Sequence, residues 1–364
     1  MIETCALFFS LCWLALLARY LSRPAIFDLA GAMLTGCIGI LAKGTTFPAF
    51  AVLGSLLIIK EGHAAWKTGF TAERVRVALL AGIAVIVPIG VGGAWSAYAD
   101  AVRAHNAFAA LLTTEILPNW IFGTWSQRFG SELWGGVAFG RALMEIFGYA
   151  MFPAVVVIFA SLMRREYTYP ALSALLAYLV PFAVFPMLHT VHNYYQVANA
   201  IFLIAAVGLA LAALAKAGRP VFAFTIFALI AVSQVVYFHR AFAPYIRANY
   251  SNEQRLRIAM IAKAGTQPTE ALIVIGDEWA STLPYYAQRK SFAIANLTPP
   301  AFLKQVLADP QKYLGDRTFG GIVHCPKTGP ADAERQDIVA GFVANRKMLG
   351  EFGDCKFLDR KQGG

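Results

Sequence analysis

The stretch Gly31-Ala32-Met33-Leu34-Thr35-Gly36-Cys37-Ile38-Gly39-Ile40-Leu41-Ala42-Lys43-Gly44 places a lysine directly after a run of apolar and small residues. A second apolar run, 45–59, follows at once. Two such runs in a row predict membrane-spanning helices joined by a tight turn. A cation that close to the membrane interior is costly and needs a partner or a role. Lys43 either extends its ammonium to the headgroups or binds a phosphate group as a compact cation.

Composition extends this interpretation to most of the chain. Hydrophobic residues make up 58% and charged residues 14% of the 364 residues, whereas soluble domains are about a quarter charged. The sequence therefore predicts a polytopic α-helical membrane protein. Its eight predicted spans centre on 3–18, 27–42, 45–59, 77–95, 143–162, 170–188, 197–214 and 220–238. Most basic residues of 1–238 lie in short loops, and no basic–aromatic groove is visible in the sequence. We therefore expect no nucleic-acid partner, despite the net charge of +10.

Basic residues alternate between the loops. They concentrate after the first, third, fifth and seventh spans, which predicts that these loops are cytoplasmic. Lys43, the connection 96–142, the cluster 189–195 and the tail from 239 would then lie outside the inner membrane. Met1 would also lie outside, ahead of any span. We therefore expect upstream helices that this sequence does not contain; a chain with a genuinely external N-terminus is the alternative.

The connection 96–142 has an amphipathic pattern with several tryptophans, which predicts a helix lying in the membrane interface. Arg128, within Trp125-Ser126-Gln127-Arg128-Phe129, is a candidate phosphate ligand on that helix. Contact with lipid headgroups is the alternative role.

The tail, 239–364, changes in composition and predicts a small α/β domain. Short apolar runs at 273–275, 321–324 and 356–358 predict strands. Helices are expected to open near Ser281 and over 301–307 and 334–346, and Gly276-Asp277-Glu278-Trp279 ends the first strand. Cys325 and Cys355 each adjoin a predicted strand, and their spacing leaves open whether they form a disulfide.

The sequence His189-Thr190-Val191-His192-Asn193-Tyr194-Tyr195 is the second polar cluster. Its imidazole and phenol groups favour a phosphate- or sugar-binding edge. An interfacial aromatic belt with solvated histidines is one alternative. A divalent-cation site on His189 and His192 is another, although no carboxylate lies nearby in the sequence.

Carboxylates are few on the predicted outer face of the helical bundle. Glu3 is the only one at the outer mouth of a predicted span, so it is the candidate general base, with a solvated helix N-terminus as the alternative. Glu145 lies just inside the fifth span, from which it could reach the interface.

Together these motifs resemble those of GT-C fold glycosyltransferases, in particular the bacterial enzymes related to protein O-mannosyltransferases and to the lipid A aminoarabinose transferase. The similar segments are the Gly-rich helix ending in Ala42-Lys43-Gly44, His192-Asn193-Tyr194-Tyr195 before an apolar run, Glu3-Thr4, and Val274–Trp279 with Tyr285-Tyr286. The resemblance implies transfer of a sugar from a polyprenyl phosphate at the outer face of the cytoplasmic membrane.

By the same resemblance, Lys43 and Tyr195 contact the donor phosphate, with Tyr194 as the alternative in register and with His192 and Arg128 nearby. The family's catalytic aspartate lies in an external loop that precedes everything in this sequence, so the resemblance implies an incomplete chain. The resemblance implies no certain cofactor, and a divalent cation is the alternative. A transporter for an anionic lipid, or a non-catalytic binding subunit, are the rival interpretations; an inverted repeat, expected of many transporters, is not visible.

Overall fold

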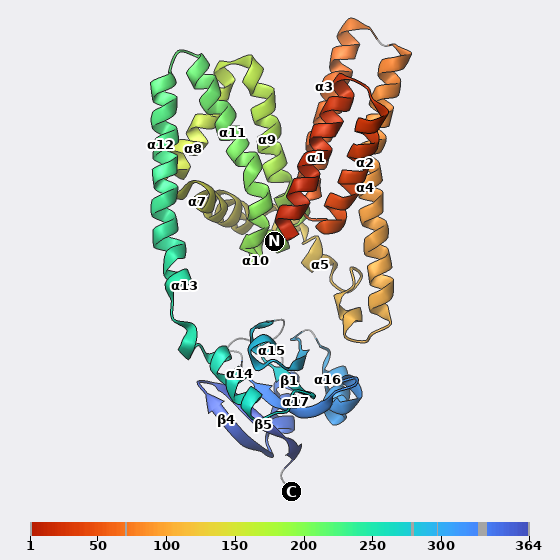
Figure 1. Ribbon diagram of the computed structural model, residues 1–364, viewed down its shortest axis with the longest axis vertical. Helices are drawn as coiled ribbons and strands as arrows, with labels where there is room; N and C mark the ends of the chain where they lie inside the picture. Colours follow the sequence, from red (N-terminus) through yellow and green to blue (C-terminus); the bar gives the residue numbers. More distant parts are fainter. Residues whose placement is uncertain (1, 70, 278–279, 297, 327–332, 363–364) are drawn as a thin grey trace. The chain divides into compact units, whose positions relative to one another are not determined.

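The computed structural model describes residues 2–69, 71–277, 280–296, 298–326 and 333–362. Three residues named above lie outside this set: Met1, Glu278 and Trp279. The chain divides into two compact units, Met1–Ile246 and Arg247–Gly364. The first is helical and the second contains a sheet (Figure 1).

The helical unit combines long helices with several short ones. Its helices are α1 (Ile2–Ser22), α2 (Ile26–Ala42), α3 (Phe47–Thr68), α4 (Ala72–Ala104), α5 (Pro118–Ile121), α6 (Trp125–Phe129), α7 (Ala142–Phe147), α8 (Met151–Ile158), α9 (Arg165–Val184), α10 (Pro186–Val191), α11 (Gln196–Lys216), α12 (Pro220–Tyr237) and α13 (Ala243–Arg247). Tighter or wider helical turns lie between them: η1 (Ala109–Leu112), η2 (Glu132–Arg141), η3 (Gly148–Ala150), η4 (Phe159–Met163), η5 (Asn193–Tyr195) and η6 (Phe238–Phe242).

Within the described residues, seven helical segments are long and apolar enough to cross a membrane. They are Ile2–Ser22, Phe47–Thr68, Ala72–Ala104, Glu132–Met163, Arg165–Val184, Asn193–Lys216 and Pro220–Arg247. The remaining expected span, 27–42, is α2, a shorter apolar helix. The helical unit thus has the character of a polytopic membrane protein, and the number of eight spans stays a prediction.

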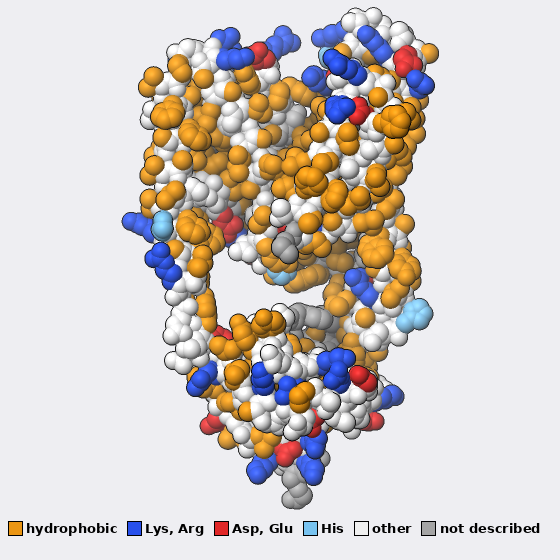
Figure 2. All heavy atoms as spheres, viewed as in Figure 1, with side chains coloured by type: hydrophobic (Ala, Val, Ile, Leu, Met, Phe, Trp, Pro, Cys, Tyr) orange, Lys and Arg blue, Asp and Glu red, His pale blue; other side chains and the backbone are white. Residues whose placement is uncertain are grey.

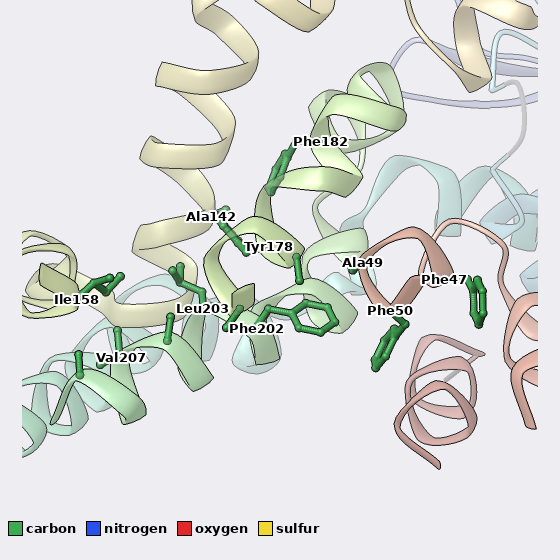
Figure 3. Close-up of a cluster of buried hydrophobic side chains, with 14 of the residues drawn as sticks. Phe47, Ala49, Phe50, Ala142, Ile158, Tyr178, Phe182, Phe202, Leu203 and Val207 are labelled. Atoms are coloured by element: carbon green, nitrogen blue, oxygen red, sulfur yellow. The ribbon is translucent and has the colours of Figure 1, made fainter. Parts of the chain in front are cut away.

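The core of the helical unit depends on close helix approach. Trp13 is fully buried, and its indole N–H donates to the carbonyl of Ala84 at 3.0 Å. Glycine is needed opposite the indole because a Cβ at Gly36 or Gly54 would lie within 2.5 Å of it. Phe50 of α3 packs edge-on against Phe202 of α11, with ring centroids 5.0 Å apart, and so joins α1–α4 to the later helices (Figure 3).

The connection 96–142 differs from the prediction. The apolar helix before it continues as α4 to Ala104, where a 3₁₀ turn and the two short helices α5 and α6 replace the single interfacial helix expected. Pro118 begins α5, and Thr124 begins α6 with a capping box to Gln127. These local start signals divide the segment more finely than its amphipathic pattern indicated.

The second unit has a five-stranded sheet of order β2-β1-β3-β5-β4. Its elements are η7 (Tyr250–Asn252), α14 (Gln254–Ala264), β1 (Glu270–Ile275), α15 (Thr282–Ala287), β2 (Lys290–Ile294), α16 (Pro300–Ala308), η8 (Pro310–Tyr313), β3 (Thr318–His324), α17 (Ala333–Val343), β4 (Arg346–Phe352) and β5 (Cys355–Gln362). Strands β2, β1 and β3 are parallel, whereas β5 runs antiparallel to β3 and to β4.

This unit contains the three strands predicted and two more, β2 and β4. The helix expected over 334–346 ends at Val343, and Arg346 instead begins β4. Helices α14 and α15 pack on one face of the sheet, and α16 and α17 on the other. Cys325, directly after β3, forms a disulfide with Cys355 at the start of β5, which answers the question that the sequence left open.

Candidate functional site

The site forms around Lys43, the C-terminal cap of α2. Its ammonium pairs with the carboxylate of Glu3 in the first turn of α1, and both side chains are largely covered, at 13% and 14% exposed. The ring centroids of Tyr195 and Tyr194 lie 4.1 and 4.8 Å from Lys43 Nζ. The structure therefore brings together four predicted site residues, which come from α1, α2 and η5. An ammonium held over two aromatic faces is stabilised by the negative potential of the rings.

The chain reaches this position through a break in a long helix. Phe185 precedes Pro186, and a residue before proline is disfavoured in the helical conformation. Accordingly α9 ends at Val184, and α10 restarts with Pro186 in its first turn. Arg141 holds the short α10 in place, because its guanidinium donates to the carbonyls of His189 and Thr190 at 2.6 and 3.1 Å.

The two predicted histidines have different environments. His189 is 1% exposed, and burial lowers its pKa to about 4, so its imidazole is neutral at pH 7. His192 lies beyond the end of α10 with an extended backbone, and its ring stacks on Tyr194 with centroids 5.0 Å apart. The cation-site alternative assumed that the two histidines lie on one helical face, but His192 lies beyond the helix that carries His189. No group of three or more His, Cys, Asp or Glu side chains suited to a metal forms among the residues that the structure describes.

A small cavity lies beside the Lys43 cluster. Its lining residues are Glu3, Thr45, Thr46, Pro181, His189, Tyr195, Ala198, Asn199 and Phe202. At about 10 Å³ it has room for about one water molecule. Three buried polar atoms of its lining make no hydrogen bond within the described part of the chain: Thr45 Oγ1, His189 Nε2 and Asn199 Oδ1. Buried polar atoms are normally paired, so this cavity is suited to a polar group.

Gln196 connects this cavity to a larger one. Its amide nitrogen lies 3.1 Å from His189 Nδ1. Because an amide nitrogen only donates, Nδ1 accepts in this orientation and the imidazole proton lies on Nε2. His189, which lines the smaller cavity, then offers Nε2 as a hydrogen-bond donor. Gln196 also lines a second cavity of about 370 Å³, together with Glu145, Ile146, Asn193, Tyr194, Val197, Ala200 and Phe242. Tyr194 thus contacts both the Lys43 ammonium and a roomier cavity, whose lining is mostly apolar but includes Glu145, Asn193 and Gln196.

Glu145, expected from its sequence position only to reach the interface, is a functional candidate. Its side chain is half-buried within a segment apolar enough to span a membrane, and it lines the larger cavity. No ion pair to Glu145 occurs among the described residues. A carboxylate inside an apolar segment is costly unless it has a role. That rule alone, applied to the segment around Glu145, could have singled it out.

Arg128 does not join the Lys43 cluster through any described contact. Its guanidinium donates to the carbonyls of Ala183, Gly123 and Phe122 at 3.0, 3.3 and 2.6 Å, and it lies over the ring of Trp125. The bond to Ala183 therefore fastens the connection before η2 to the end of α9, and the other two bonds stay within that connection. In this arrangement Arg128 ties parts of the chain together, and its role as a phosphate ligand stays a prediction.

Comparison of the chain with protein-family models, with curated proteins and with solved structures finds no match.

Proposed function

We propose that this protein is a GT-C-like glycosyltransferase that binds the phosphate of a polyprenyl-phosphate sugar at Lys43 and transfers the sugar to an acceptor. The observation that carries the proposal is the Lys43 ammonium held by Glu3, Tyr194 and Tyr195 beside two cavities whose linings include polar side chains. A cation at the end of an apolar helix suits a ligand whose charge lies at the interface and whose tail stays in the bilayer.

The same groups could stabilise the charge that develops during transfer. When the bond between sugar and phosphate breaks, negative charge grows on the leaving phosphate, and donors already in place lower that barrier. Lys43 supplies the charge, while Tyr195 and His189, which both line the small cavity beside it, supply hydrogen-bond donors. Glu3 competes with the phosphate for Lys43, so it holds the ammonium in place until the donor arrives.

The base that activates the acceptor is better assigned to Glu145 than to Glu3. The carboxylate of Glu3 is occupied by Lys43, whereas Glu145 lines the cavity in which an acceptor hydroxyl could approach Tyr194.

Two observations support an outer-face site. Figure 2 shows Lys and Arg gathering at the end of the helical unit that carries the α1–α2, α3–α4 and α11–α12 connections, as expected of a cytoplasmic face. The disulfide between Cys325 and Cys355 suits an oxidising compartment. We therefore propose eight spans in the inner membrane, with the Lys43 cluster and residues 239–364 outside.

Binding of polyprenyl phosphate to the purified full-length chain in nanodiscs tests the proposal. Lys43→Ala should weaken binding at least tenfold, whereas Lys67→Ala, an exposed lysine at the far end of α3, should not change it. Equal affinity in the wild type and Lys43→Ala would overturn the phosphate role. Binding without sugar release from any polyprenyl-phosphate sugar would favour the transporter or the binding subunit over the enzyme.

A further inference from the structure

An apolar groove lies between the early and the late helices of the helical unit. Its volume is about 370 Å³, and almost all of its surface is apolar. Its lining comes from α1, α3, α9 and α11: Leu11, Leu14, Leu53, Leu56, Leu57, Lys60, Tyr169, Pro170, Ser173, Ala174, Ile201, Phe202 and Ala205. Phe202 also lines the small cavity at the Lys43 cluster, so its ring separates that polar space from the groove.

One cation lies at the rim of this groove. Lys60 is exposed, and within the described residues it makes no ion pair or hydrogen bond. It lies two turns before Lys67, towards the end of α3 at which basic residues gather. Tyr169 lies beside it on the groove wall and donates to the carbonyl of Leu56 at 2.7 Å, which links α9 to α3. The groove therefore has an apolar body and a single positive group at one end.

We propose that this groove holds one anionic phospholipid, with its phosphate on Lys60 and one acyl chain along the apolar wall. The helices that form the groove are apolar enough to cross a membrane, so lipid is the solvent at its mouth. Inside a bilayer an acyl chain gains little from leaving other chains, so retention of one lipid depends on packing and charge. Lys60 supplies the charge and favours an anionic over a zwitterionic headgroup.

The lipid would complete the seam between the two groups of helices. Direct contacts across that seam include the ring pair of Phe50 and Phe202 and the hydrogen bond from Tyr169 to Leu56. An acyl chain between Leu53, Leu57 and Ile201 would fill the space that these contacts leave. This inference does not depend on the proposed enzymatic activity, since the groove lies on the other side of Phe202 from the Lys43 cluster.

Native mass spectrometry of the full-length protein in mild detergent tests the proposal. The protein is titrated with phosphatidylglycerol and with phosphatidylcholine that have matched acyl chains. We expect one phosphatidylglycerol to bind about three- to tenfold more tightly than phosphatidylcholine. Lys60→Gln should abolish that preference, whereas Lys67→Gln on the same helix should keep it. Equal binding of the two lipids, or a preference that survives Lys60→Gln, would overturn the proposal.

A second pair of variants tests the acyl-chain part. Ala205→Phe places a ring in the groove and should reduce binding of both lipids, whereas Ala215→Phe, exposed on the same helix α11 and outside the groove, should not. Both positions are exposed, so both variants should fold. Full lipid binding by Ala205→Phe would show that the acyl chain does not use this groove.

Discussion

The two ends of the helical unit place the same residue types in different environments. At one end Lys43 is covered, paired with Glu3 and stacked over two tyrosine rings. At the other end Lys67 is exposed, and Arg76 and Glu73 form a pair whose side chains are 66% and 60% exposed. The charges at the exposed end are open to solvent, whereas the covered end concentrates charge among largely covered side chains. A charge in such a place interacts more strongly with any ligand that reaches it.

The histidines repeat this contrast. His189 is buried beside Tyr195 and Gln196, whereas His63 on α3 is exposed. Because the covered end is also where buried polar atoms make no hydrogen bond among the described residues, function is expected there. The following changes should affect the covered end strongly and the matched residues at exposed positions little.

The largest effect is expected from Glu145→Gln. If Glu145 is the base, release of polyprenyl phosphate from a polyprenyl-phosphate sugar should slow by about 10²–10⁴-fold, the usual contribution of a general base. Glu132→Gln, an exposed carboxylate at the start of η2, is the control. An unchanged rate in Glu145→Gln would assign the base to another residue.

A smaller effect should follow from protonation of His189. Burial lowers its folded-state pKa to about 4, below the value of about 6.5 in an unfolded chain. The unfolded state therefore binds the proton first as pH falls. The resulting stability is fully present above about pH 6.5 and declines towards pH 4, by on the order of 2–3 kcal/mol.

Thermal unfolding of the full-length protein between pH 7.5 and 4.5 measures this loss. His189→Gln should flatten the dependence on pH, and His63→Gln should leave it unchanged. A pH profile that is the same in the wild type and His189→Gln would show that His189 is not the titrating group.

The smallest effect concerns the ion pair itself. A double-mutant cycle with Glu3→Gln and Lys43→Gln should give a coupling energy of about 1 kcal/mol or more. Removing one partner of a covered pair leaves the charge of the other covered and uncompensated. The same cycle on Glu73 and Arg76 should give a clearly smaller coupling, because water screens that pair. Equal couplings would remove the electrostatic difference between the two ends.

The sequence predicted those features that depend on local composition. Apolar runs located the helices, and buried-strand patterns located β1, β3 and β5. The strands that were missed, β2 and β4, lie at the two edges of the sheet. An edge strand buries fewer side chains, and in β4 most residues are exposed or only half-buried, so its sequence lacks an apolar run. α14 was missed because its buried Ile258, Ala259 and Ala262 form only a short apolar run between charged residues, with Arg255 and Arg257 before it and Lys263 after it.

The candidate site was predictable only in part, for a related reason. Lys43 and the tyrosines carry their own signal, since polar groups at the ends of apolar helices are unusual. The roles of Arg128 and Glu145 depend on groups distant in the chain: Arg128 donates to a carbonyl 55 residues away, and the cavity at Glu145 is completed by Tyr194 and Phe242. No local pattern encodes such contacts.

Photo-crosslinking tests most directly whether the covered end is the functional one. A polyprenyl phosphate with a diazirine on its first isoprene unit is bound to the full-length protein, irradiated, and the adducts are mapped by mass spectrometry. We predict adducts within 1–8, 43–50 and 189–202, lost in Lys43→Ala and kept in Lys67→Ala. Adducts confined to the Lys67 end of the helices, or unchanged by Lys43→Ala, would contradict the assignment of lipid-phosphate binding to Lys43.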